Sequence, residues 1–129
     1  IDCQGKSSVD FATFLADRDE RRMDGMFFSG WQMDYPSIEN FLAPLYATDA
    51  GTNDGKYSNP EFDAKLTEAA AAEGDEANTL YQEAEAILVE DFPAFPLWYG
   101  KAVGGWSENV NSVPFDPFGV PEWTAISTK

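Results

Sequence analysis

Histidine is absent from this sequence, and cysteine occurs once, as Cys3. The two absences exclude zinc, haem and iron–sulfur sites of the usual kinds, because those sites are built from histidine and cysteine ligands. They also exclude Ser-His-Asp and Cys-His catalysis within the chain. We therefore expect no metal and no cofactor, and the single thiol cannot form an intrachain disulfide.

Positive charge and long apolar runs are also scarce. The 129 residues include 8 Lys and Arg against 23 Asp and Glu, which gives a net charge of −15. That charge repels phosphate backbones, so nucleic acid is not an expected partner. No apolar run approaches the roughly 18 residues that a membrane span needs. We expect a soluble chain with room for one domain.

Hydrophobic residues are nevertheless plentiful. They make up 43% of the chain, and aromatic residues 15%, which is too much for a disordered acidic tail. The chain should therefore fold and bury a core. We interpret Cys3 as a half-buried thiol at the end of a strand, in preference to a lipidated cysteine, because only two residues precede it. The chain has no initiating Met and opens as a piece of a longer protein would.

Four helices are predicted from hydrophobic spacing and from capping signals. They span residues 9–22, 36–45, 60–73 and 77–91. Ser7 or Ser8 is the expected cap of the first helix, and Asn59 followed by Pro60 begins the third. Pro44 should cut or kink the second helix near its end.

Short apolar runs before, between and after the helices are predicted as strands. They lie at residues 1–3, 26–31, 95–99, 101–106 and 123–127. The order of elements predicts an α/β fold with a short mixed sheet and about four helices. Asp and Asn side chains in the polar loop 47–58 hint at calcium, but their spacing does not match an EF-hand loop. The aromatic tail should pack on a surface that the rest of the chain does not supply.

A succession of short motifs carries a family resemblance. The motifs are Trp31-Gln32-Met33-Asp34-Tyr35-Pro36, Asn40-Phe41-Leu42, Tyr57-Ser58-Asn59-Pro60-Glu61-Phe62-Asp63, Leu80-Tyr81-Gln82-Glu83-Ala84-Glu85 and Pro96-Leu97-Trp98-Tyr99. Their order over residues 8–129 resembles the C-terminal part of the extracytoplasmic oligopeptide- and dipeptide-binding proteins of bacterial ABC importers. Whole members are several times longer, and two lobes of a type II periplasmic-binding-protein-like fold close on the ligand.

The resemblance implies an organisation and a set of partners. Residues 1–98 would be the C-terminal part of the second ligand-binding lobe, and residues 99–129 would be a segment returning towards the first. The partners would be a peptide or another small solute and the permease subunits of the transporter. The protein would work outside the cytoplasm, and the full-length form would be tethered to the membrane by a lipid.

The resemblance also implies a ligand site. Asp34 resembles the aspartate that holds the amino terminus of the peptide, where a carboxylate and an ammonium form a charge-assisted hydrogen bond. From the residues alone, Asp34 is instead favoured as the cap of the helix that follows. Trp31 would form the wall of a side-chain pocket, although plain core packing is an equal interpretation.

The neighbours of these two residues complete the expected site. The backbone of Gly30 and Gln32 resembles family positions that pair with an extended ligand like an added strand. Gly30 would allow close approach of that ligand. Met33 lies between Gln32 and Asp34 and is included with them. Such main-chain recognition reads no side chains, which fits broad specificity.

Three alternatives stay open. Relatives of this family take other solutes, such as sugars or chelated nickel. A small hydrolase would need a pair of carboxylates across a cleft, and nothing in the sequence places such a pair. A stand-alone acidic interaction domain would instead unfold cooperatively as a monomer. Under the family interpretation the chain alone should bind peptides weakly or not at all, because binding energy comes from both walls of a two-lobe cleft. Its uncovered faces should self-associate, and no catalysis is expected.

Overall fold

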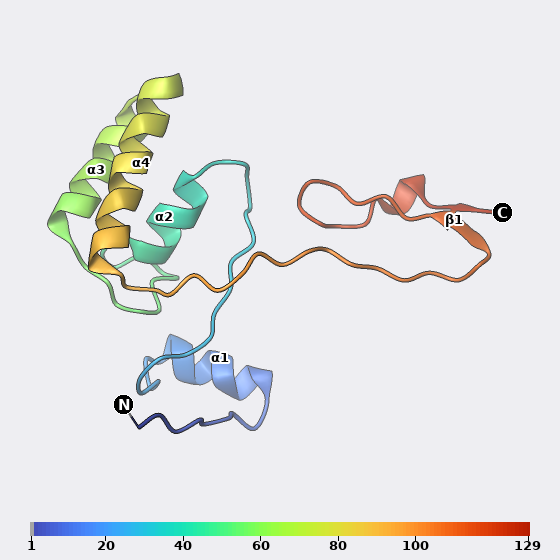
Figure 1. The fold of residues 1–129 in the computed structure, drawn as a ribbon, viewed down its shortest axis with the longest axis horizontal. Helices are drawn as coiled ribbons and strands as arrows, with labels where there is room; N and C mark the ends of the chain where they lie inside the picture. Colours follow the sequence, from blue (N-terminus) through green and yellow to red (C-terminus); the bar gives the residue numbers. More distant parts are fainter. Residues whose placement is uncertain (1) are drawn as a thin grey trace.

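The structure, a computed structural model, describes residues 2–129. Its elements are the helices α1 (Phe11–Asp19), α2 (Glu39–Tyr46), α3 (Pro60–Ala71) and α4 (Gly74–Asp91), the strand β1 (Val110–Ser112), a 3-10 turn (Trp123–Ala125) and the strand β2 (Ser127–Thr128). Helices α2, α3 and α4 pack together, α1 lies apart from them, and residues 100–129 extend away as a C-terminal arm (Figure 1). The predicted α/β class with four helices is confirmed. The sheet, within residues 2–129, is antiparallel and two-stranded, not mixed.

The hydrophobic core is small and lies between three helices. Helices α3 and α4 run side by side, and α2 packs against α4 (Figure 1). The buried apolar side chains are Leu42, Phe62, Leu66, Ala69, Ala84 and Leu88. Phe62 is 0% exposed, and its ring centroid lies 5.6 Å from that of Tyr57. No helix in the described part of the chain is long and apolar enough to cross a membrane.

Helix caps were predicted correctly at one helix and wrongly at another. The Asn59 side chain accepts hydrogen bonds from the first N–H groups of α3, as its position before Pro60 predicts. Helix α1 is capped by Asp10, whose Oδ1 accepts from the Thr13 N–H at 2.7 Å, and not by Ser7 or Ser8. The reason is that α1 begins at Phe11, so the two serines lie too far from its first turn.

Most of the segments predicted as strands are extended but unpaired. Within the described residues, 26–31, 95–99 and 101–106 belong to no strand. Phe28 and Trp98 stack with ring centroids 5.6 Å apart, so the first two segments meet through side chains and not through a backbone ladder. A strand needs a neighbour for its N–H and C=O groups, and these segments have none within residues 2–129.

The ends of the chain also differ from the prediction. Of the strand predicted at residues 1–3, Ile1 lies outside the described residues, and Cys3 is exposed and in no strand. The strand predicted at 123–127 is mostly a 3-10 turn, and only its last residue enters β2. Strand β2 then pairs antiparallel with β1 at the end of the C-terminal arm that is farthest from the helices (Figure 1).

The C-terminal arm contains a tight turn that is organised by one carboxylate and lies at the end of the arm nearer the helices (Figure 1). Asp116 Oδ1 accepts from the backbone N–H groups of Phe118 and Val120, each at 2.9 Å. Gly119 within this turn has a φ of 76°, which an L side chain rarely adopts. A Cβ atom built there would also lie 3.1 Å from the Cβ of Ala102. The turn therefore depends on a glycine at that position.

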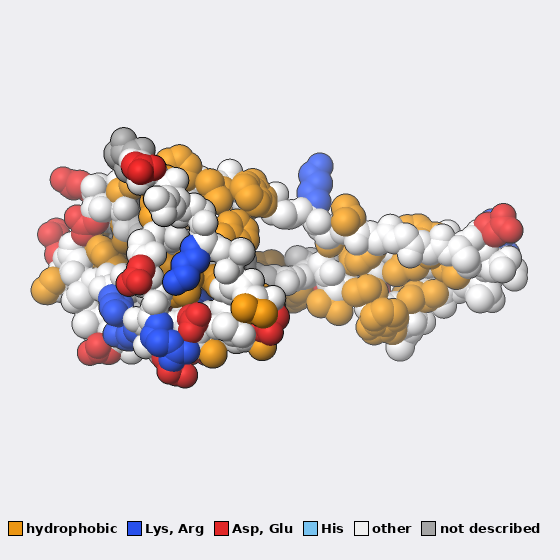
Figure 2. Space-filling view, turned by 90° about the horizontal axis from the view of Figure 1, so that it is seen from below, with side chains coloured by type: hydrophobic (Ala, Val, Ile, Leu, Met, Phe, Trp, Pro, Cys, Tyr) orange, Lys and Arg blue, Asp and Glu red, His pale blue; other side chains and the backbone are white. Residues whose placement is uncertain are grey.

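The chain exposes far more surface than a compact protein of its mass. Its accessible area is 9975 Å², whereas a compact monomer of this size has about 6,800 Å². Many large hydrophobic side chains are exposed, and they are prominent along the C-terminal arm (Figure 2). The exposed large apolar residues after α4 are Phe92, Phe95, Leu97, Trp98, Tyr99, Val103, Trp106, Val120 and Trp123. Apolar area on this scale is typical of surfaces that contact other molecules.

Candidate functional site

The residues before α2 form a turn that sets the direction of the helix. The Ser37 N–H donates to the Tyr35 carbonyl at 2.8 Å, and the Glu39 N–H donates to the Ser37 hydroxyl at 3.2 Å. Helix α2 consequently begins at Glu39 and not at Pro36 as predicted. Within the described residues Asp34 accepts no hydrogen bond from a backbone N–H of α2, so its interpretation as a helix cap is wrong.

Asn40 lies at the centre of this region. Its side chain is 2% exposed, and its Oδ1 accepts from the Trp31 indole N–H at 3.1 Å and from the Asp34 backbone N–H at 2.8 Å. Its Nδ2 lies 3.4 Å from Asp34 Oδ2 and donates to it. Side chains on a helix tilt towards its N-terminus, so Asn40 in the first turn of α2 reaches back over residues 31–34.

The sequence-based search missed Asn40 because the helical pattern places it on the wrong face. Ile38, Leu42 and Leu45 follow the apolar spacing of α2. Asn40 is two residues from Leu42, about 200° around the helix, which is the side expected to face water. It is buried because residues 31–34 fold over it. One signal could have indicated the burial of Asn40. It is an Asn in the first turn of a helix that is preceded by a Trp and an Asp.

The carboxylate of Asp34 remains exposed and has no cationic partner. Within the described residues, none of the ion pairs to Lys or Arg involves Asp34. The nearby Glu39 carboxylate accepts a short hydrogen bond from the Tyr35 hydroxyl, and this bond raises the pKa of Tyr35. Asp34 and Glu39 therefore give this region a negative charge that no basic side chain among residues 2–129 neutralises.

The other predicted site residues are placed differently from one another. Trp31 and Met33 are half-buried, whereas Gly30 and Gln32 are exposed. A Cβ atom built at Gly30 would meet no atom within 4 Å, so the backbone there is open to approach from outside. The Gln32 side-chain amide donates a short hydrogen bond to the Phe118 carbonyl and so ties this region to the C-terminal arm. The structure thus joins Trp31 and Asp34 through Asn40.

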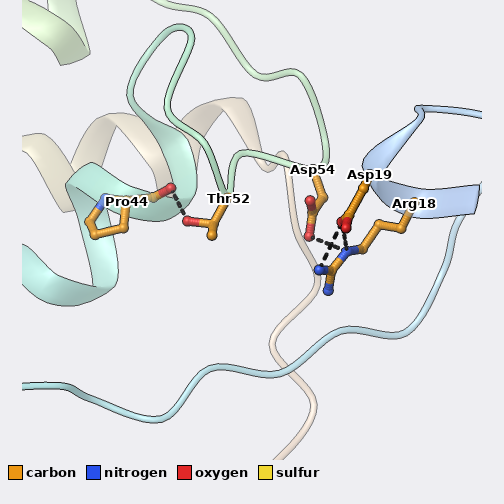
Figure 3. A network of polar contacts seen from close by, with 5 residues as sticks. All are labelled: Arg18, Asp19, Pro44, Thr52 and Asp54. Carbon is orange, nitrogen blue, oxygen red and sulfur yellow. Dashed lines mark hydrogen bonds and ion pairs between the residues drawn. The ribbon is translucent and has the colours of Figure 1, made fainter. Parts of the chain in front are cut away.

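A second polar cluster lies beside α1 and has a structural role. Arg18 Nε lies 3.2 Å from Asp54 Oδ2, and Arg18 Nη2 lies 3.1 Å from Asp19 Oδ1 (Figure 3). In the same loop the Thr52 hydroxyl donates to the Pro44 carbonyl, one of the last carbonyls of α2, which lack partners within the helix. The Arg18 guanidinium is therefore paired with two carboxylates, which ties α1 to the loop that follows α2.

The loop that hinted at calcium is organised by an asparagine. Asn53 is 4% exposed, and its Nδ2 donates to the carbonyls of Ala47 and Tyr57 at 3.0 and 2.7 Å. Its Oδ1 accepts from the Tyr57 N–H at 3.0 Å. All its polar atoms are thus used within the loop. Within residues 2–129 no group of three or more acidic, Cys or His residues is arranged to hold a metal ion.

Comparisons with known proteins give a consistent set of relatives. No family model matches the chain. It is 33% identical over 99 residues to a dipeptide-binding protein of Pseudomonas aeruginosa, which covers 74% of this chain and 18% of the relative. It is 27% identical over 108 residues to a probable di/tripeptide-binding protein of the same species, covering 81% of this chain and 20% of the relative. Heme-binding protein A of Haemophilus influenzae is 30% identical over 101 residues, covering 76% and 18%. The chain thus spans about a fifth of the length of these curated relatives.

Proposed function

This chain is related to the bacterial dipeptide- and oligopeptide-binding proteins that its motifs resemble, and we propose that it is part of the solute-binding component of an ABC importer. That component captures oligopeptides in a cleft between two lobes outside the cytoplasm and delivers them to the permease subunits in the membrane. It breaks no bond and needs no cofactor. The printed names of the relatives support a peptide as the ligand.

The observation that carries the proposal is the free carboxylate of Asp34. It is exposed, it does not cap α2, and no Lys or Arg pairs with it in the described part of the chain. A peptide with a free amino terminus carries an ammonium, which is the partner that such a carboxylate lacks. Trp31 is half-buried and its indole N–H is bonded to the same Asn40, so its ring would form a wall of the site near this carboxylate.

The remaining site residues support an extended ligand. Gly30 presents an open backbone, so a peptide can approach it closely and pair with the main chain of Gly30 and Gln32. Met33 is half-buried beside them and would contribute an adaptable apolar contact. Main-chain pairing with a single fixed charge recognises any peptide that has a free amino terminus.

The proposed organisation divides the chain after residue 98, a short distance beyond the end of α4 at Asp91. Residues 1–98 would belong to the second lobe, and residues 99–129 would lead back to the first. The extended course of residues 100–106 and the apolar surface of the C-terminal arm support this division. The same exposed surface supports self-association of the chain by itself. The full-length protein would be anchored by a lipid and would dock on the permease.

The test is a titration of the full-length protein that contains this chain, in which both walls of the cleft are present, with tri-alanine and with N-acetyl-tri-alanine, followed by the backbone amide resonances. An exposed ion pair contributes up to about 1 kcal/mol, so acetylation should weaken binding about fivefold. Tri-alanine should shift the resonances of residues 30–34. Equal binding of the two peptides, or no shift in that region, would contradict the proposal. A dilution series separates these shifts from self-association.

A different small solute is the second candidate, because one relative is named a heme-binding protein. This chain has no histidine, so it offers no imidazole to an iron ion. Titration with haemin distinguishes the candidates. A shift of the Soret band that saturates at one equivalent of haemin, together with no binding of tri-alanine, would favour the second candidate over the first.

A further inference from the structure

We propose that Asn40 is the positioning residue of the ligand site, which fixes Asp34 and Trp31 in the arrangement that receives a peptide's amino terminus. This inference rests on the proposed function. It adds a residue that contacts no ligand and acts through its two neighbours. Asn40 is 2% exposed, so it is closed off from the solvent where a ligand would arrive.

The hydrogen bonds require an asparagine side chain. Two N–H donors, from the Trp31 indole and the Asp34 backbone, meet Asn40 Oδ1 at 3.1 and 2.8 Å, which uses both lone pairs of a carbonyl oxygen. Nδ2 faces the Asp34 carboxylate at 3.4 Å. An aspartate at position 40 would have no donor for that carboxylate, and turning the amide over would place its NH₂ group against two donors.

The arrangement restrains Asp34 from two sides. Its backbone N–H and its carboxylate are bonded to opposite ends of one buried amide. Because Asn40 is in the first turn of α2, the helix transmits its rigidity to the residue that would bind the ammonium. Fixing a charged side chain before the ligand arrives reduces the entropy lost on binding.

Loss of Asn40 should leave the fold but release the site. Asn40→Leu retains a side chain of similar size at the buried position, so it keeps the packing and removes only the polar atoms. The matched control is Asn53→Ala, since Asn53 is the other buried asparagine and is bonded only within the loop 47–57. It should destabilise the chain without affecting the ligand site.

The first measurement needs no ligand. In the unmodified chain the indole N–H of Trp31 should exchange with solvent more slowly than those of Trp98 and Trp123, which are 71% and 72% exposed. In Asn40→Leu the Trp31 indole should exchange at the rate of those two. A Trp31 indole that exchanges unchanged in Asn40→Leu would overturn the positioning role.

The second measurement is the ratio of the dissociation constants of N-acetyl-tri-alanine and tri-alanine, measured in the full-length protein that contains the chain. We expect about fivefold for the unmodified chain and for Asn53→Ala, and about one for Asn40→Leu. If the unmodified chain discriminates and Asn40→Leu discriminates equally, the inference is wrong and the proposed function stands. If the unmodified chain does not discriminate, the proposed function fails, and the positioning role built on it fails too.

Discussion

Replacing Phe62 with alanine should remove most of the stability of the helical core. Phe62 is 0% exposed and packs with Leu42, Leu66 and Ala84 between the three helices. Truncating a fully buried phenylalanine typically costs about 3–5 kcal/mol, from lost transfer free energy and the cavity that remains. The core has so few buried side chains that no second layer can close over that cavity, so we expect a value in this range.

The assay is urea unfolding followed by far-UV circular dichroism, with Phe11→Ala as the matched control. Phe11 is 71% exposed on α1, so the same truncation there should change the free energy of unfolding by less than about 0.5 kcal/mol. If Phe62→Ala has no folded baseline, Phe62→Leu should still show a clear loss. Equal effects at positions 62 and 11, or a loss below about 1 kcal/mol for Phe62→Ala, would refute the packing described above.

Three further outcomes are expected around the loop that joins α2 to α3 and its contact with α4. Hydrogen bonds from Tyr57 and Asn59 lower the pKa of Asp91 below 3.8, so this carboxylate stabilises the fold above that pH and the contribution is lost as the pH falls through its folded pKa. Acid unfolding of Asp91→Asn should lack this pH-dependent loss of stability. Burial and the hydrogen bond to Asp91 raise the pKa of Tyr57 from 10.0 to about 12. The contribution of this phenol to the free energy of unfolding is therefore complete below pH 10 and is lost between about pH 10 and 12. Alkaline unfolding of Tyr57→Phe should lack this pH-dependent loss. Asn53→Ala leaves three backbone groups of Ala47 and Tyr57 without a partner and should lower the free energy of unfolding in urea by about 1–3 kcal/mol or more.

Local signals in the sequence predicted the helices well. Asn59 caps α3 because a side-chain oxygen followed by Pro60 satisfies the first N–H groups and sets the first φ angle. The apolar spacing of Phe62, Leu66 and Ala69 likewise identified the buried face of α3. Pro44 lies inside α2, which continues to Tyr46, so the proline does not cut the helix at its own position and the helix ends two residues later. These features depend only on neighbours along the chain.

The strands were not predictable in the same way. An apolar run such as residues 26–31 indicates burial, but pairing depends on a neighbour that the run itself does not specify. In the structure this segment meets residues 95–99 at the Phe28–Trp98 stack, and no backbone hydrogen bond joins the two segments within the described residues. The two strands that do pair, β1 and β2, have no clear apolar pattern, and they are joined through the turn organised by Asp116.

The candidate site was predicted from the family resemblance, and its ligand-binding role stays a prediction. Local chemistry favoured a helix cap for Asp34, which the structure contradicts. Asn40 was missed because helix periodicity reports which face meets the core and not which face the preceding loop covers. The tie between Gln32 and Phe118 joins residues 86 apart, and no local pattern predicts such a contact.

The exposed apolar surface shapes the expected behaviour in solution. A compact chain of this length would have a radius of gyration of about 14 Å. The extended C-terminal arm and the large accessible area of 9975 Å² predict a larger value for the monomer, or self-association that covers the aromatic side chains. Small-angle scattering over a concentration series distinguishes a compact particle from either outcome.

The most direct test of the proposed recognition crosses a change in the protein with a change in the ligand. Dissociation constants of the full-length protein are measured for tri-alanine and N-acetyl-tri-alanine with the unmodified chain, with Asp34→Asn, and with Asp49→Asn, an exposed acid that makes the same change of charge elsewhere. If Asp34 binds the ammonium, acetylation should weaken binding about fivefold in the unmodified chain and in Asp49→Asn but not in Asp34→Asn. The same loss on acetylation in all three chains would contradict that role.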